Sequence, residues 1–153
     1  MSKQDQTRLL FAGREWASAL DACCDFPVSA LDGGGKVWLA STAYVGGQRL
    51  LRLHGLNSDG DGAARDLVVP GSTGVGAPAV CGVGSGCVTV CPVEQAGRWR
   101  IACFFPGAEA PVFLDAGGTV NDQPAVAAAG SVAYVAWQSN AGATRAIYAA
   151  PVA

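Results

Sequence analysis

The sequence predicts an all-β protein, a β-propeller built from about three four-stranded blade units per chain. The first observation is a repeat marked by Pro27, Pro78 and Pro124, which lie 51 and 46 residues apart. The second is an apolar run with a period of two after each proline, and the third is the glycine-rich turns between these runs. Self-similarity at a fixed period indicates a repeat architecture, and four short antiparallel strands per 40–50 residues describe a propeller blade.

The composition supports one domain of closely packed sheets. The chain has 153 residues, and only 14% of them are charged, against about 25% in an average domain. The net charge is −2, and the ten Lys and Arg residues form no run. A nucleic-acid partner is therefore not expected.

The sequence also predicts where in the cell the protein is found. It contains no apolar run long enough to span a membrane, and Met1–Gln6 is too polar to begin a signal peptide. We therefore expect no membrane partner and a cytoplasmic location, where the six cysteines stay reduced.

Residues 1–24 are expected to supply one or two strands that complete a blade. Thr7–Ala12 matches Thr144–Ala149 in residue type at every position, which favours a strand. The apolar residues Leu9, Ala12 and Trp16 are three or four apart, which also fits a helix. We predict the strand.

The blade units are expected at 25–75, 76–121 and 122–153, as parts of one domain. We label the four strands of a unit A to D in chain order. Each proline is expected at the start of strand A, because the first residue of a strand tolerates a missing N–H. Strands B and C follow, and the first two units add a strand D. The predicted strands are Pro124–Ala129, Ser131–Gln138 and Thr144–Ala149 in the third unit, with strands D at Asp66–Val69 and Pro111–Leu114.

The third unit carries a resemblance to a known family. Its segments Pro124–Val126, Val132–Trp137 and Arg145–Tyr148 resemble blades of bacterial sialidase-like (BNR-type) β-propellers. The resemblance covers roughly residues 25–153 and implies a fold far more than an activity. The layout of repeats also resembles short bacterial lectins, whose chains assemble into a complete propeller.

Three blades would leave sheet edges open, whereas propellers usually have four to eight blades. We therefore expect a homodimer that forms a six-bladed ring, with the N-terminal strand of one copy completing the C-terminal blade of the other. The alternative is completion by a different protein.

Tryptophan and arginine residues are the candidates for ligand binding. Trp99 lies between Arg98 and Arg100, Trp38 follows a lysine by two residues, and Arg49 begins another strand. By the resemblance, an exposed Trp beside a charged group is how propeller lectins bind a sugar. The alternative is that these rings fill the space between blades.

Two groups of residues could hold a metal. Asn57, Asp59 and Asp61 follow an N-x-D-x-D-G pattern, which can wrap a calcium ion but is also suited to a plain turn. We favour the turn and expect no cofactor, with a calcium ion as the alternative. Four cysteines of the second unit could bind zinc, but their spacing lacks a C-x2-C pair, and we predict that they pack as small apolar residues. They are Cys81, Cys87, Cys91 and Cys103.

No catalytic set is apparent. The resemblance to sialidases implies an arginine triad and a tyrosine paired with a glutamate. Arg145 is one residue out of step with Arg49 and Arg100, so the three would not converge. We therefore predict a non-enzymatic binding module that acts in protein–protein interaction. The alternative is a carbohydrate-binding lectin, and a sialidase-like glycosidase is less favoured.

Overall fold

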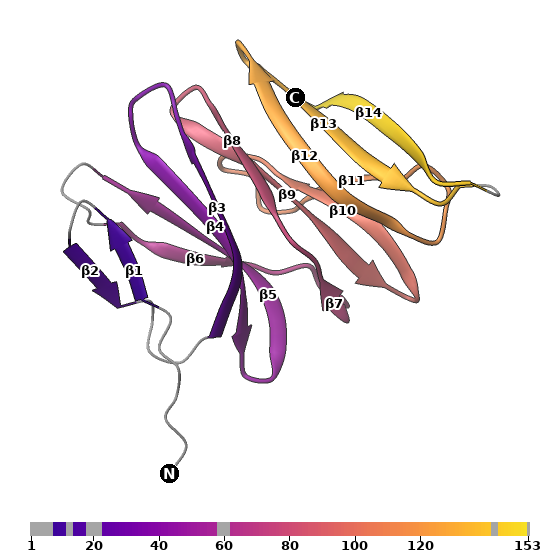
Figure 1. The fold of residues 1–153 in the computed structure, drawn as a ribbon, viewed down its shortest axis with the longest axis horizontal. Helices are drawn as coiled ribbons and strands as arrows, with labels where there is room; N and C mark the ends of the chain where they lie inside the picture. The colour runs from indigo at the N-terminus through magenta and orange to yellow at the C-terminus, as the bar shows by residue number, and fades with distance from the viewer. Residues whose placement is uncertain (1–7, 12–13, 18–22, 58–61, 142–143, 153) are drawn as a thin grey trace.

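The computed structural model describes residues 8–11, 14–17, 23–57, 62–141 and 144–152. These residues form fourteen strands and no helix, which confirms the all-β prediction. They make three larger antiparallel sheets and one two-stranded hairpin, and the three sheets follow one another across the molecule in chain order (Figure 1). Within this part of the chain, no helix is long and apolar enough to cross a membrane.

The first sheet is a meander of four strands, as predicted for a complete unit. A tight turn at Gly46 and Gly47, with φ of 57° and 80°, joins the second and third of them. Positive φ at both central residues suits a two-residue hairpin, and glycine adopts it without steric cost. The strands are β3 (Cys23–Leu31), β4 (Val37–Val45), β5 (Gln48–Leu56) and β6 (Ala64–Leu67), in that spatial order.

The second sheet has five strands, and the third has three. In the second, β7 and β8 both pair with β9, so together they stand in the place of one strand A. The third sheet contains no fourth strand among the described residues, so β14 is an edge. The strands are β7 (Gly74–Val75), β8 (Ala79–Val83), β9 (Gly86–Gln95), β10 (Arg98–Phe104), β11 (Val112–Leu114), β12 (Asn121–Ala129), β13 (Val132–Ser139) and β14 (Ala146–Val152).

The N-terminal segment contains the predicted strand. β1 (Arg8–Phe11) pairs with β2 (Arg14–Ala17) as a hairpin. This hairpin lies beyond the first sheet, on the side away from the second sheet (Figure 1). Neither strand pairs with β14 in the single chain, so completion of a blade by this segment stays a prediction.

The repeated proline marks a β-bulge, which corrects the prediction that it begins strand A. In the first sheet, strand β3 starts four residues before Pro27, at Cys23. Between the pairs Asp25–Thr42 and Val28–Ala40, β3 has one residue more than β4. A bulge leaves its extra residue unpaired, so the proline's missing N–H costs no ladder hydrogen bond.

The same irregularity recurs in the other two sheets. β12 shifts register between Asp122 and Ala125, and the residue before its proline, Gln123, has a φ of 50°. In the second sheet, the break between β7 and β8 contains Pro78 and again adds one residue relative to β9. Strand A of each unit therefore has one extra residue at its proline, relative to the strand with which it pairs.

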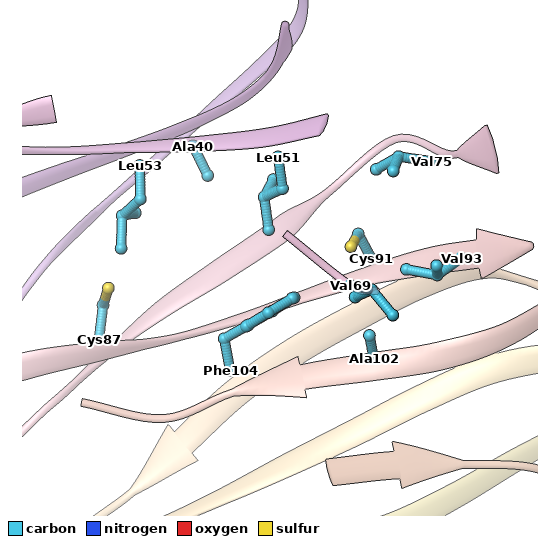
Figure 2. Close-up of a cluster of buried hydrophobic side chains, with 10 residues drawn as sticks. All are labelled: Ala40, Leu51, Leu53, Val69, Val75, Cys87, Cys91, Val93, Ala102 and Phe104. Carbon is cyan, nitrogen blue, oxygen red and sulfur yellow. The ribbon is translucent and has the colours of Figure 1, made fainter. Parts of the chain in front are cut away.

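The sheets pack face to face, and each has a forward face toward the following sheet and a backward face toward the preceding one. Ala40, Leu51 and Leu53 on the forward face of the first sheet are at most 2% exposed. Figure 2 shows these side chains directed at the second sheet. The opposing backward face contributes Cys87, Cys91, Val93, Ala102 and Phe104 to the same cluster.

The second and third sheets pack in the same manner. Val90 and Ile101, on the forward face of the second sheet, are fully buried with Val135 and Trp137 from the backward face of the third. The indole Nε1 of Trp137 donates a 3.0 Å hydrogen bond to the buried Asn121. This stacking is compatible with propeller blades, but the described residues do not close into a ring, since no strand of the first sheet pairs with the third.

Candidate functional site

A cavity of about 300 Å³ lies between the first and second sheets. Lys36, Trp38 and Leu53 line it from the first sheet and the turn before β4, and Arg65 lines it from β6. The opposite wall is formed by the turn before β9 and by Cys87 at its beginning. Thus one of the predicted ligand-binding residues, Trp38, lines a cavity.

Asp32 fixes the position of Trp38. Its Oδ2 accepts a 3.0 Å hydrogen bond from the indole Nε1 of Trp38. Its Oδ1 accepts hydrogen bonds from the backbone N–H groups of Gly34 and Lys36, at 2.9 and 3.0 Å. The indole hydrogen bond, followed by these backbone bonds, lowers the pKa of Asp32. The ionised carboxylate therefore orders both the turn and the aromatic wall of the cavity.

Glycines allow the two units to approach closely beside the cavity. The backbone N–H of Gly33 donates a 2.8 Å hydrogen bond to the carbonyl oxygen of Gly84 in the next unit. A Cβ on Gly82 would overlap the carbonyl oxygen of Leu31. Because backbone meets backbone here, the cavity walls are held by main-chain contacts.

Two basic side chains, Lys36 and Arg65, line the cavity, and the Asp32 carboxylate that is bonded to Trp38 interacts electrostatically with Lys36. The Nζ of Lys36 lies 4.6 Å from the centroid of the Trp38 ring. Among the described residues, no carboxylate oxygen is within 4.0 Å of the charged groups of Lys36 or Arg65. Burial raises the pKa of the Cys87 thiol, so that side chain stays neutral. The cavity thus combines an aromatic ring, two cations and apolar walls.

The residues around Trp99 do not form a comparable site. Arg98 donates a 3.0 Å hydrogen bond to Asp115. Arg100 instead stacks its guanidinium 4.1 Å from the Phe113 ring centroid and donates to a glutamine of β9. Trp99 itself is half-buried. The two predicted arginines therefore interact with different partners inside the second unit.

Arg49 belongs to a separate cluster at the opposite end of β4 and β5. Its guanidinium lies 5.3 Å from the ring centroid of Phe26 and 5.5 Å from that of Tyr44. Its Nη2 is 4.0 Å from the Oδ2 of Asp25. Since Tyr44 pairs with Arg49 while Trp38 pairs with Gly55, Arg49 and Trp38 do not share a site.

The metal predictions fall partly outside the described residues. Asn57 is exposed, but Asp59 and Asp61 lie outside the described ranges, so the calcium loop stays a prediction. Within those ranges, no group of three or more His, Cys, Asp or Glu residues could hold a metal ion.

The four cysteines of the second sheet lie on its two faces, as packing residues. Cys81 and Cys103 belong to the forward cluster, and Cys87 and Cys91 to the backward cluster. All four are buried free thiols, and burial raises the pKa of Cys103 to about 12. The sheet separates the two pairs, which confirms the packing prediction.

The forward face of the third sheet is an apolar surface that the sequence analysis did not single out. Tyr134 and Ile147 on this face are 51% and 68% exposed. Their neighbours on the same face include Ala125, Ala127 and Ala149, all exposed. Within 124–151 the strand residues that point to either side of the sheet are apolar. This pattern in the sequence could have revealed the exposed apolar surface. We call it the open face.

Comparison with family models, curated proteins and solved structures finds no match to this chain. The likeness to sialidase-like blades therefore stays a prediction.

Proposed function

We propose that this protein is a non-catalytic binding module that acts through protein–protein interaction, with a second copy of itself as the first partner. The observation that carries the proposal is the open face of the third sheet. The corresponding faces of the first two sheets are each covered by the next sheet, which buries Leu53 in one and Ile101 in the other. Tyr134 and Ile147 have no such cover within the described residues.

The unpaired edge of the third sheet supports the same proposal. β6 and β11 occupy the strand D position in the first two sheets, whereas β14 pairs with β13 alone among the described residues. Free backbone N–H and C=O groups on such an edge favour pairing with another chain. In the proposed dimer, an N-terminal strand of one copy pairs with β14 of the other and closes a six-bladed ring.

The arginine positions support a role without catalysis. Arg49 and Arg100 each stack on aromatic rings of their own sheet, and the exposed Arg145 donates a 3.3 Å hydrogen bond to Gln138. Each arginine therefore interacts with side chains of its own unit. The buried free thiols are in keeping with a reducing, cytoplasmic location.

Light scattering on the intact chain tests the proposal. We expect twice the chain mass of 15.4 kDa. Ile147→Glu puts a charge on the open face and should give a monomer, because a buried unpaired carboxylate is costly. Val112→Glu is the matched control, since Val112 is 51% exposed on β11 of the middle sheet. A wild-type monomer at the highest soluble concentration, or a dimer that survives Ile147→Glu, would contradict the proposal.

One observation favours the alternative of a carbohydrate-binding lectin, namely the position of Trp38 at the cavity. Binding to a glycan array that disappears in Trp38→Ala but persists in Trp99→Ala would support that alternative.

A further inference from the structure

Two basic side chains reach the cavity between the first and second sheets, one from the turn before β4 and one from β6. They are Lys36 and Arg65. Arg52 and Arg98, by contrast, are paired with carboxylates at 2.6 and 3.0 Å. Among the described residues, the two cavity cations form no ion pair of this kind, and the Asp32 carboxylate acts on Lys36 from beyond 4.0 Å.

The remaining walls suit the body of a small molecule. Trp38 offers an indole ring, while Leu53 and Cys87 are at most 4% exposed and provide an apolar floor. The volume of about 300 Å³ is at the lower end of the range for small-molecule sites. Such a cavity accommodates one ring that bears one or two substituents.

The walls are also held in place before any ligand arrives. The indole of Trp38 is fixed by its hydrogen bond to Asp32, a side chain that is 8% exposed. On the other wall, a Cβ on Gly86 would lie 2.8 Å from a carbon of Pro106, so the two segments already touch. A preformed cavity costs little conformational entropy on binding.

We infer that this cavity binds a small organic anion, a carboxylate carried on a ring. The carboxylate would interact with Lys36 and Arg65, and the ring would contact Trp38 and Leu53. This site is distinct from the open face of the third sheet and does not rest on the proposed self-association.

NMR titration of the intact chain with two probes tests the inference. Benzoate represents an aromatic acid and glucuronate a sugar acid, and benzamide and glucose are their neutral counterparts. The indole N–H signal of Trp38, assigned by its loss in Trp38→Phe, reports binding at the cavity. We expect a dissociation constant of about 1 mM for one of the acids and at least about tenfold weaker binding of its neutral counterpart. Binding of benzoate would identify the ligand class as aromatic acids, and binding of glucuronate would identify it as sugar acids.

A second test removes the positive charges that line the cavity. Lys36→Gln combined with Arg65→Gln should weaken binding of the acid by at least about fivefold. Arg145→Gln is the matched control, because this arginine is exposed just before β14 and lies outside the cavity lining. Arg65→Gln alone, which changes an exposed side chain, keeps the test valid if the double variant does not fold.

Three results would overturn the inference. The first is that neither acid shifts the Trp38 signal at about 10 mM, well above the expected dissociation constant. The second is that acid and neutral counterpart bind equally. The third is that binding is the same in wild type, Arg65→Gln and the double variant.

Discussion

Replacing Leu51 by alanine removes a side chain from the contact between the first and second sheets. Leu51 is 1% exposed and points from β5 toward the second sheet (Figure 2). The substitution deletes three carbon groups, each worth about 0.8 kcal/mol of transfer free energy. Adding a term for the cavity left behind gives a loss of about 3–4 kcal/mol in the free energy of unfolding. For a chain of this size, the melting temperature should fall by roughly 10 °C.

Urea unfolding followed by far-UV circular dichroism measures this loss. Leu31→Ala is the matched control, because the same atoms are deleted from a side chain that is 65% exposed. We expect the control to change the free energy of unfolding by less than about 0.5 kcal/mol. If the two variants lose equal stability, the first and second sheets do not share the core described above.

Two further predictions concern the contact between the first two units. The pKa of Asp32 is lowered, chiefly by the indole of Trp38, so its stabilising effect is present above the ordinary pKa of 3.8 and is lost as the pH falls through the lowered value. The melting temperature of the wild type should therefore fall more steeply below about pH 4 than that of Asp32→Asn, and parallel curves would contradict this. Gly82→Ala should destabilise the fold by about 1–3 kcal/mol in urea unfolding, because its Cβ would overlap the Leu31 carbonyl oxygen. Unchanged stability, as expected for the exposed Ser85→Ala, would show that the close approach is absent.

Much of the fold could be predicted from local sequence. Strand β13 (Val132–Ser139) lies within one residue of its predicted range, because it is an apolar run bounded by turn residues. β14 (Ala146–Val152) extends three residues beyond the predicted end of strand C. The end of a strand depends on how far its partner continues, and that is not visible within the strand itself.

The role of the repeated proline could not be predicted in the same way. A bulge is a mismatch between two strands, so it appears only when Asp25 and Val28 are matched to their partners on β4. Pro27 viewed alone is equally suited to the start of a strand.

At the candidate sites, some contacts follow from the local sequence and others depend on how the strands pair. Lys36 and Trp38 are close in sequence, and their cation–π contact follows from that spacing. Arg65 joins them at the cavity because β6 pairs with β5 and brings a distant segment to the same wall. Arg98 and Arg100 are also close in sequence, yet Arg98 bonds to Asp115 while Arg100 stacks on Phe113.

The sequence alone determined that this chain is built of repeated β units, because a period of two and recurrent glycine turns are local properties. Outside the bulges, it also determined which residues share a face within each strand. Only the tertiary structure decided which faces are covered. Apolar residues occur on the forward faces of all three sheets, but those of the first two are buried by the sheet that follows. Tyr134 and Ile147 stay exposed because, within the described chain, no sheet follows theirs.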